Sequence, residues 1–202
     1  MSRRSGDGQK NQRAAGYPSE FERQVTLQDG RIVDVRPVVP EDAAELREAI
    51  KTADADTVSR RFLGGPPSVT PALLEYLTVL DYRTRFGLVA RDRLTGRGVG
   101  IGRYEQVGDG AAEVAVAVHP EWRRVGLATA LVHLLAEAAL ARGISTFAAS
   151  FLTDNHPVAA LLADAGVGAA GFIADGIAEV QFPLTGPPTP PGRRTNPPHS
   201  TL

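Results

Sequence analysis

Residues 113–142, EVAVAVHPEWRRVGLATALVHLLAEAALAR, decide the fold of this 202-residue chain. Apolar side chains alternate at the start of the stretch, so the valines at 114, 116 and 118 share one face of a predicted strand and Glu113 lies on the other. From Leu127 the apolar residues recur every three or four positions, which predicts a helix that ends at Gly143. A strand, a short turn and a long helix therefore follow one another directly.

The turn between strand and helix, Arg123-Arg124-Val125-Gly126, has the composition of an anion site. Small residues at Gly126 and Ala128 let a ligand approach the backbone, and the amides at a helix start favour a phosphate. The motif is neither a Walker A loop nor G-x-G-x-x-G, which disfavours nucleotide hydrolysis and nicotinamide binding. The alternative is a tight turn whose small residues serve packing alone.

Outside this stretch, strand-like and helix-like segments alternate. Hairpins are predicted over Asp29-Gly30 and over Asp175-Gly176, with single strands over 86–92, 98–106 and 144–150. Helices are predicted from Pro40 to about Ala53, from Pro71 to Leu80 with Thr70 or Ser68 as the cap, and from Asn155 to Ala165. This order of elements predicts an α/β fold with a mixed sheet.

The composition excludes several classes of function. With 22 basic and 23 acidic residues, the chain has no overall attraction to nucleic acid or to anionic lipid. Cysteine is absent, and no His, Asp or Glu trio has metal-ligand spacing, so no metal is predicted. No apolar run approaches the ~18 residues of a membrane span, and the N-terminus lacks the apolar core of a secretory signal. A cytoplasmic protein is expected.

Three segments differ in composition. Residues 1–20 are polar without periodicity, and residues 185–202 hold six prolines with almost nothing apolar to bury. Both are expected to be disordered, although a ligand for a proline-recognition domain is an alternative for the tail. Residues 21–184 are expected to form one compact domain without an internal repeat.

The segments resemble the GNAT N-acetyltransferase superfamily, whose cofactor loop reads Gln/Arg-x-x-Gly-x-Gly/Ala and is here Arg123-x-x-Gly126-x-Ala128. DGRIVDVRPVVPEDAAEL, RRFLG, LTVLDYRTRFGLVARD, GIGRYE, AEVAV and DGIAEVQFPL are similar to the catalytic domain of bacterial protein-lysine acetyltransferases. The resemblance covers about residues 21–184. It implies the GNAT fold, a twisted, mixed but mostly antiparallel sheet of about seven strands flanked by about four helices.

The resemblance also implies acetyl-CoA as the acyl donor. A splayed and bulged strand would pair its backbone at Val116, Ala117 and Val118 with the pantetheine arm and polarise the thioester carbonyl. Asn155 would bind the cofactor from the next helix, or act only as its cap. The pyrophosphate would lie against the loop and helix start, which comprise Arg123, Arg124, Val125, Gly126, Leu127, Ala128 and Thr129.

Acetylation of an amine needs a base, because a lysine with a pKa near ~10.4 is almost entirely protonated at neutral pH. In the protein acetyltransferases that the chain resembles, a glutamate on the strand before the loop takes this proton. Glu113 stands at the matching position. The alternative is an exposed strand residue paired with an arginine.

The sequence departs from the superfamily at the usual general acid. The tyrosine that many members carry seven residues after the helix-leading Asn is Leu162 here. Because a thiol has a pKa near ~8.5, the CoA thiolate can leave with little help. Tyr104, Tyr82 and His119 are possible replacements, with core packing or a surface turn as their alternatives. Val167 replaces a usual aromatic, and His133 and His156 are expected at the surface of helices.

The expected function is transfer of an acetyl group from acetyl-CoA to a primary amine, with the resemblance favouring a protein lysine. Attack is expected to be direct within a ternary complex, because no cysteine and no serine triad is present. Two alternatives stay open: a small amine as the acceptor, or a catalytically weak acyl-CoA-binding regulatory module. The sequence leaves the acceptor, the acyl-chain length and the oligomeric state undetermined.

Overall fold

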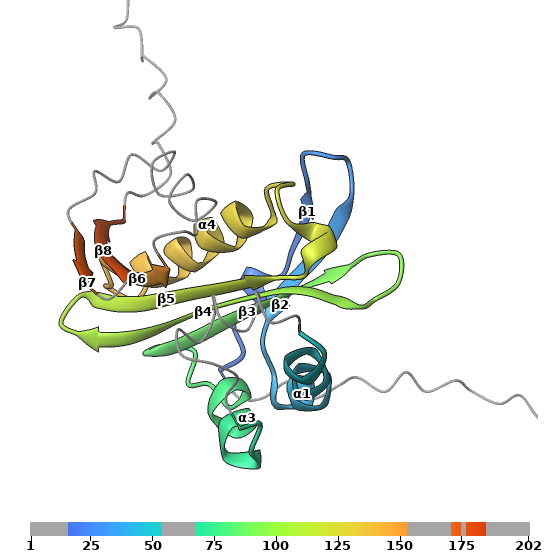
Figure 1. The fold of residues 1–202 in the computed structure, drawn as a ribbon, viewed down its shortest axis with the longest axis horizontal. Helices are drawn as coiled ribbons and strands as arrows, with labels where there is room; N and C mark the ends of the chain where they lie inside the picture. The colour runs from blue at the N-terminus through green and yellow to red at the C-terminus, as the bar shows by residue number, and fades with distance from the viewer. Residues whose placement is uncertain (1–15, 54–67, 153–170, 175–176, 185–202) are drawn as a thin grey trace, which may run out of the picture.

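The computed structural model describes residues 16–53, 68–152, 171–174 and 177–184 (Figure 1). The strands are β1 (Arg23–Thr26), β2 (Ile32–Pro37), β3 (Arg85–Asp92), β4 (Gly98–Gly108), β5 (Ala111–Val118), β6 (Thr146–Leu152), β7 (Gly171–Ala174) and β8 (Ile177–Pro183). The α-helices in these ranges are α1 (Ala43–Thr52), α3 (Pro71–Thr78) and α4 (Leu127–Leu140). Short 3-10 helices are η1 (Ser19–Phe21), η2 (Pro40–Asp42) and η3 (Pro120–Trp122).

The strands form one sheet in the order β1-β2-β3-β4-β5-β6-β8-β7. Among the described strands only β5 and β6 pair in parallel, and every other neighbouring pair is antiparallel. The predicted mixed, mostly antiparallel sheet is therefore confirmed, and the described residues contribute eight strands to it where about seven were expected. The predicted helix at 155–165 lies outside the described residues. No helix in the described ranges has the length and apolarity needed to cross a bilayer.

Helices cover both faces of the sheet, with α4 on one face and α1 and α3 on the other (Figure 1). β4 is glycine-rich beneath α4, and a Cβ at Gly102 would lie 3.0 Å from Leu135 Cδ1 and 3.5 Å from Leu131 Cβ. Glycine therefore allows the helix to approach the sheet closely. The buried face of α4 comprises Leu127, Leu131, Leu135, Ala138 and Ala139. The predicted apolar stripe is confirmed, with Leu134 only partly buried.

Aromatic rings cross the core from strand to strand. Tyr104 in β4 stacks on Phe86 in β3 at a centroid distance of 5.6 Å and contacts Phe147 in β6 at 5.8 Å. Phe147 in turn meets Phe182 in β8 edge-on at 6.0 Å. Such ring pairs add about 0.5–1.5 kcal/mol each beyond the burial of their surface. These ring contacts stabilise the packing of the central strands, and the site described below lies on those strands.

The predicted helix starts are found with their expected residues. Pro40 opens η2, which leads into α1, and Asp42 accepts hydrogen bonds from the Val39 amide (2.9 Å) and from Arg36 Nη2 (2.6 Å). At α3 the Thr70 hydroxyl accepts from the Leu73 amide at 3.1 Å, so Thr70 is the cap of this helix.

Packing against the core begins before the predicted domain start at residue 21. The Tyr17 ring meets Tyr82 edge-on at a centroid distance of 5.9 Å, and its hydroxyl donates to Glu22 at 2.8 Å. Phe21 follows in η1 and is 3% exposed. The described structure thus includes a few residues of the predicted N-terminal segment.

Candidate active site

β5 has an open edge next to Glu113. The strand pairs with β4 along its whole length, but with β6 only over residues 111–113. Beyond that point β5 and β6 have no paired residues, which confirms the predicted splay. The predicted bulge is wrong, because the register with β4 is regular over residues 112–118 and its irregularity lies at Gln106/Gly108. The divergence of two parallel strands alone makes the opening.

The peptide groups of alternate residues face this opening. His119 donates its amide to the Val99 carbonyl at 2.9 Å, toward β4. Because successive residues of a strand point their N–H and C=O groups to opposite edges, those of Val118 and Val116 face away from β4. Arg123 Nε donates to the Val118 carbonyl at 3.4 Å, in agreement with this direction. Of the three residues expected to bind through their backbone, Val116 and Val118 therefore face the opening and Ala117 faces β4.

The turn that follows β5 presents six consecutive amides. Within the described ranges, no N–H of residues 124–129 donates a hydrogen bond, and the first paired amide is that of Ala130, to the Gly126 carbonyl at 3.0 Å. Gly126 caps α4 with φ +87°, a conformation that glycine adopts freely, and Arg124 has φ +59°. Unpaired donors at the positive end of a 14-residue helix favour an anion.

The β1–β2 hairpin braces this turn, a contact that the sequence does not reveal. The Gln28 amide donates to the Val125 carbonyl at 3.1 Å, and a Cβ at Gly126 would meet the Gln28 side chain at 3.4 Å. The Arg31 guanidinium lies 3.9 Å from the Trp122 ring centroid and donates to the Glu121 carbonyl at 3.0 Å. Two strands distant in sequence thus hold the loop in place.

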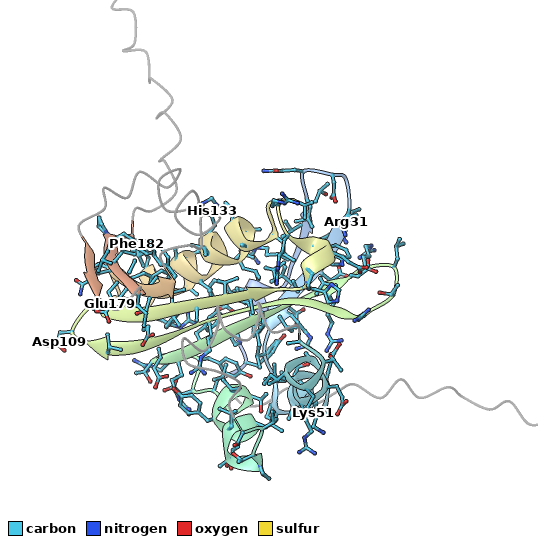
Figure 2. The ribbon with its side chains drawn as sticks, viewed as in Figure 1. Arg31, Lys51, Asp109, His133, Glu179 and Phe182 are labelled. Atoms are coloured by element: carbon cyan, nitrogen blue, oxygen red, sulfur yellow. The ribbon has the colours of Figure 1, made fainter. Side chains whose placement is uncertain are left out.

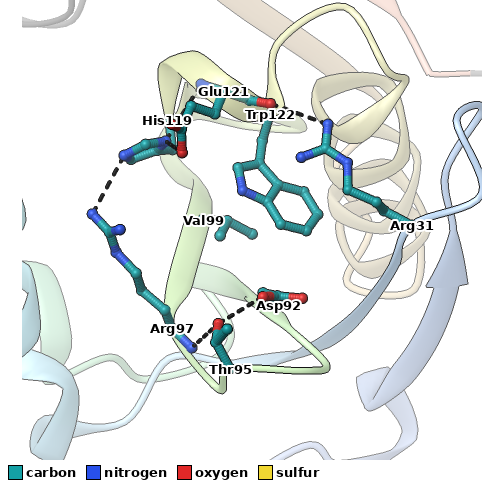
Figure 3. Close-up of a pocket in the computed structure, with 8 residues that line it drawn as sticks. All are labelled: Arg31, Asp92, Thr95, Arg97, Val99, His119, Glu121 and Trp122. Carbon is teal, nitrogen blue, oxygen red and sulfur yellow. Dashed lines mark hydrogen bonds and ion pairs between the residues drawn. The ribbon is translucent and has the colours of Figure 1, made fainter.

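A cavity of about 330 Å³ opens beside η3 (Figure 3). His119 lies at its wall, 3.4 Å from Arg97 Nη2 and 3.8 Å from a Glu121 carboxylate oxygen. His119 is six positions along the extended chain from Glu113, or roughly 20 Å away. His119 is therefore too far away to relay a proton from Glu113. In the parts of the chain that are described, no three His, Asp or Glu side chains gather where they could hold a metal.

Glu113 is exposed on the face of the sheet that carries α1 and α3. Its neighbour Val114 is 8% exposed and belongs to the core on the α4 side. Across the strands, Glu113 lies opposite Glu105 in β4 and Ala148 in β6. Among the described residues Glu113 has no hydrogen bond and no ion pair, so no arginine in these ranges pairs with its carboxylate. Its carboxylate is available at the point where β5 and β6 separate.

Two tyrosines considered as replacement acids are buried in the core. Tyr104 is 0% exposed, and its hydroxyl donates to the Arg83 carbonyl at 3.2 Å. Desolvation raises the pKa of Tyr104 to about 12. Tyr82 donates to the Val38 carbonyl at 2.9 Å, and burial raises its pKa as well. Neither hydroxyl is available to a substrate, so both tyrosines are core-packing residues and neither can act as the general acid.

Several expected site residues lie outside the described part of the chain, namely Asn155, His156, Leu162 and Val167. One tyrosine that the sequence does not single out lies on the Glu113 face instead. Tyr76 in α3 is 41% exposed and donates its hydroxyl to Glu105, the residue opposite Glu113. The described site therefore contains a fixed carboxylate and a free one side by side.

Comparison with known proteins agrees with this geometry. The model of the "Acetyltransferase (GNAT) family" matches residues 55–167. The chain is 35% identical over 121 residues to acetyltransferase PA5475 of Pseudomonas aeruginosa, an alignment that covers 58% of this chain and 65% of that protein. It is 32% identical over 133 residues to acetyltransferase Pat of Mycolicibacterium smegmatis, covering 65% and 40%. The chain thus spans less than two thirds of either relative.

Among solved structures, the GNAT domain of S. lividans PAT superimposes with a TM-score of 0.76 at 30% sequence identity. The match covers 83% of this chain and 99% of that domain. The family model covers more than half of the 202 residues, and the superposition on a GNAT domain agrees with it. The chain therefore belongs to the GNAT acetyltransferase family.

Proposed function

We propose that this chain transfers an acetyl group from acetyl-CoA to a primary amine, and that the amine is a lysine side chain of a protein. The observation that carries the proposal is the open edge of β5, which begins at Glu113 and ends at the unpaired amides of residues 124–129. Membership of the GNAT family supports acetyl transfer. The resemblance of several segments to the catalytic domain of bacterial protein-lysine acetyltransferases supports a protein lysine as the acceptor.

The open edge can bind the donor as an extended ligand. Amide groups of the pantetheine arm can pair with the outward N–H and C=O groups of Val116 and Val118, as an added strand would. The pyrophosphate would then lie at the start of α4, against the amides of residues 124–129. The Arg124 side chain is exposed at this turn and adds positive charge. This orientation leaves the thioester at the Glu113 end of the opening.

The acceptor amine would approach from the face that carries Glu113 and α3. Glu113 takes a proton from the amine nitrogen, which forms its bond to the thioester carbon as the C–S bond breaks. An amide at the β5 edge stabilises the negative charge on the carbonyl oxygen. The sulfur leaves as a thiolate, whose pKa near ~8.5 makes it a competent leaving group without a dedicated acid. The transfer is direct, since the chain has no cysteine to carry the acetyl group.

A thiol-release assay tests the proposal. The chain is incubated with acetyl-CoA and, separately, with lysine-containing proteins, with polyamines and with amino acids, and free CoA is measured together with acetylated product. Release with proteins, accompanied by acetyl-lysine in their peptides, supports the proposal. Release with small amines alone identifies a small-molecule acetyltransferase, and acetyl-CoA binding without release across the whole panel identifies a binding module.

A further inference from the structure

Glu105 and Glu113 are direct partners on neighbouring antiparallel strands. The His119–Val99 hydrogen bond fixes the alternation, which makes residues 105 and 113 a hydrogen-bonded pair with Cα atoms about 5.5 Å apart. Their side chains therefore share one face, the face that carries α3. Like charges directly opposite one another destabilise a sheet. A cation between them would remove that repulsion.

The Glu105 carboxylate is held by one of its two oxygens. The Tyr76 hydroxyl and Arg103 Nη2 both donate to Oε2, the latter at 3.0 Å. In the described part of the chain Oε1 has no partner. Arg103 is 12% exposed, so the ion pair is shielded from solvent on the arginine side. Glu105 is thus fixed in place with one oxygen free to accept a further hydrogen bond.

Tyr76 is itself fixed between two arginines. The Arg103 guanidinium lies 4.6 Å from the Tyr76 ring centroid, and that of Arg85 lies 5.4 Å from it. Arg85 also donates to the Val79 carbonyl at 3.1 Å and so ties the end of α3 to β3. Desolvation and the hydrogen bond to Glu105 raise the pKa of Tyr76, so its hydroxyl stays protonated at neutral pH. The tyrosine therefore donates to Glu105 continuously.

We propose that Glu105 is a second acidic residue of the acceptor site, which binds the ammonium form of the incoming amine beside Glu113, and that Tyr76 positions it. An ammonium has three donors and can contact both carboxylates at once. Glu105, neutralised on one side by Arg103, keeps the amine in place while Glu113 removes its proton. The acceptor class is then a cationic primary amine on an extended apolar arm, as in lysine. This inference rests on the proposed function.

The division of roles predicts that binding and turnover respond to different carboxylates. With Nα-acetyl-lysine amide as the acceptor, Glu105→Gln should raise its KM about tenfold or more, the size of a lost hydrogen bond to a charged group. The turnover number and the acetyl-CoA Kd should stay close to those of the wild type. Tyr76→Phe keeps the ring and its arginine contacts but removes the hydroxyl, so KM should rise by a smaller factor of about three.

A charged inhibitor separates ammonium binding from a structural effect. Nε,Nε,Nε-trimethyl-lysine amide keeps a permanent positive charge and cannot be acetylated, whereas norleucine amide is its neutral analogue. The trimethyl compound should inhibit the wild type competitively and should bind Glu105→Gln about tenfold more weakly. Norleucine amide should inhibit both equally. Asp109→Asn removes one exposed carboxylate at the tip of the same hairpin and serves as the matched control (Figure 2).

The outcomes distinguish the inference from the function on which it rests. If the wild type acetylates the amine and Glu105→Gln has the same KM as the wild type, the inference is overturned and the proposed function stays in place. A parallel loss of acetyl-CoA affinity and of melting temperature in Glu105→Gln identifies a structural residue and also overturns it. If the wild type acetylates no amine, the proposed function fails and the inference fails with it.

Discussion

At the scale of single residues, the proposed reaction depends on where Glu113 stands along β5. It is the last residue of the strand with partners on both sides, Glu105 in β4 and Ala148 in β6. One residue further, the edge of β5 is open. A carboxylate at this point faces solvent on the acceptor side while the adjoining backbone is free to hold the donor. The place of Glu113 at the start of the open edge of β5 is what suits its carboxylate to accept a proton from an acceptor amine.

Replacement of Glu113 by glutamine removes the proposed base and keeps the shape of the side chain. We expect Glu113→Gln to lower the turnover number by ~10²-fold or more, because general base catalysis contributes on that order. The acetyl-CoA Kd, measured by calorimetry, should be unchanged, since the proposed donor contacts lie beyond residue 113. Asp109→Asn should retain wild-type turnover. A Glu113→Gln variant with the wild-type turnover number would exclude the residue as the base.

The sequence predicts some of these residues and not others, for a physical reason. Strand alternation places Glu113 on the exposed face, and the structure agrees. The predicted elements do not pair Glu105 with Glu113, although the two lie four residues on either side of Asp109, at the turn between β4 and β5. Tyr76 could not be predicted, because its contact with Glu105 joins α3 to β4 through packing between elements distant in sequence.

At the scale of elements, the loop before α4 is the most sensitive segment. Gly126 has φ +87°, so any side chain there is strained, and a Cβ there would contact the Gln28 side chain at 3.4 Å. Gly126→Glu also places a carboxylate against the proposed pyrophosphate site. We expect acetyl-CoA affinity to fall by at least about tenfold, as measured by calorimetry.

Gly143→Glu is the matched control for this substitution. Gly143 lies beyond the other end of α4 with φ +79°, and a Cβ there meets nothing within 4 Å. The control therefore carries similar backbone strain and the same added charge, away from the loop. Acetyl-CoA affinity should be close to wild type in Gly143→Glu. If Gly126→Glu also binds acetyl-CoA as the wild type does, the loop is not the pyrophosphate site.

The β1–β2 hairpin should contribute to donor binding through Arg31. Arg31→Ala removes the contact with the Trp122 ring and the hydrogen bond to the Glu121 carbonyl. We expect a loss of about 1–2 kcal/mol in stability and a several-fold weaker acetyl-CoA affinity, because the loop loses its brace. Calorimetry and thermal unfolding measure both. Arg93→Ala, which removes only an exposed pair with Asp34, should change neither.

Local elements were predictable because their signals are local. Apolar periodicity gives α4, and glycine at positive φ gives the Asp29-Gly30 turn, where Gly30 has φ +84°. The absence of a bulge in β5 was not predictable. The shape of β5 depends on how it pairs with β4 and β6, which are distant from one another in sequence. The divergence of β5 from β6 already provides the opening that the bulge was expected to make.

At the scale of the whole molecule, one buried ion cluster joins the sheet to α1. Asp42 is 7% exposed and accepts from Arg36, from Arg91 and from the Val39 amide. Burial alone would raise the pKa of Asp42, but the hydrogen bonds from Arg36 and Val39 and the charge of Arg36 outweigh it, so the pKa lies below its ordinary value. The carboxylate is therefore stabilised in its ionised form by the fold.

This cluster predicts a pH dependence of stability. A folded-state pKa below the unfolded value means that the stabilisation is fully present above about pH 4 and is lost as the pH falls through the folded-state pKa. Asp42→Asn should therefore lower the free energy of unfolding by about 1–3 kcal/mol at pH 7. The difference from the wild type should shrink below pH 4. Urea unfolding at both pH values measures it, and a difference independent of pH would contradict the assignment.

The overall architecture followed from the sequence because segment order restricts it strongly. Strand, turn and helix in 113–142, with hairpins at both ends of the domain, leave few sheets that can form. The position of α3 against the sheet, in contrast, does not follow from the order of the segments. It depends on contacts such as Arg85 with Val79, which no periodicity in the sequence expresses. The acceptor side of the site could therefore be described only from the structure.

Acetyl transfer to protein lysines is tested most directly by a product balance. The wild-type chain is incubated with acetyl-CoA and either lysine-containing proteins or Nα-acetyl-lysine amide as the acceptor, and the products are measured by mass spectrometry. Acetyl groups are expected on lysine ε-amines, with one free CoA for each acetyl transferred. Gly143→Glu should give the same amounts of both products, and Gly126→Glu should give much less of both at the same acetyl-CoA concentration. Free CoA without any acetylated amine, or bound acetyl-CoA with neither product, would contradict acetyl transfer to lysine.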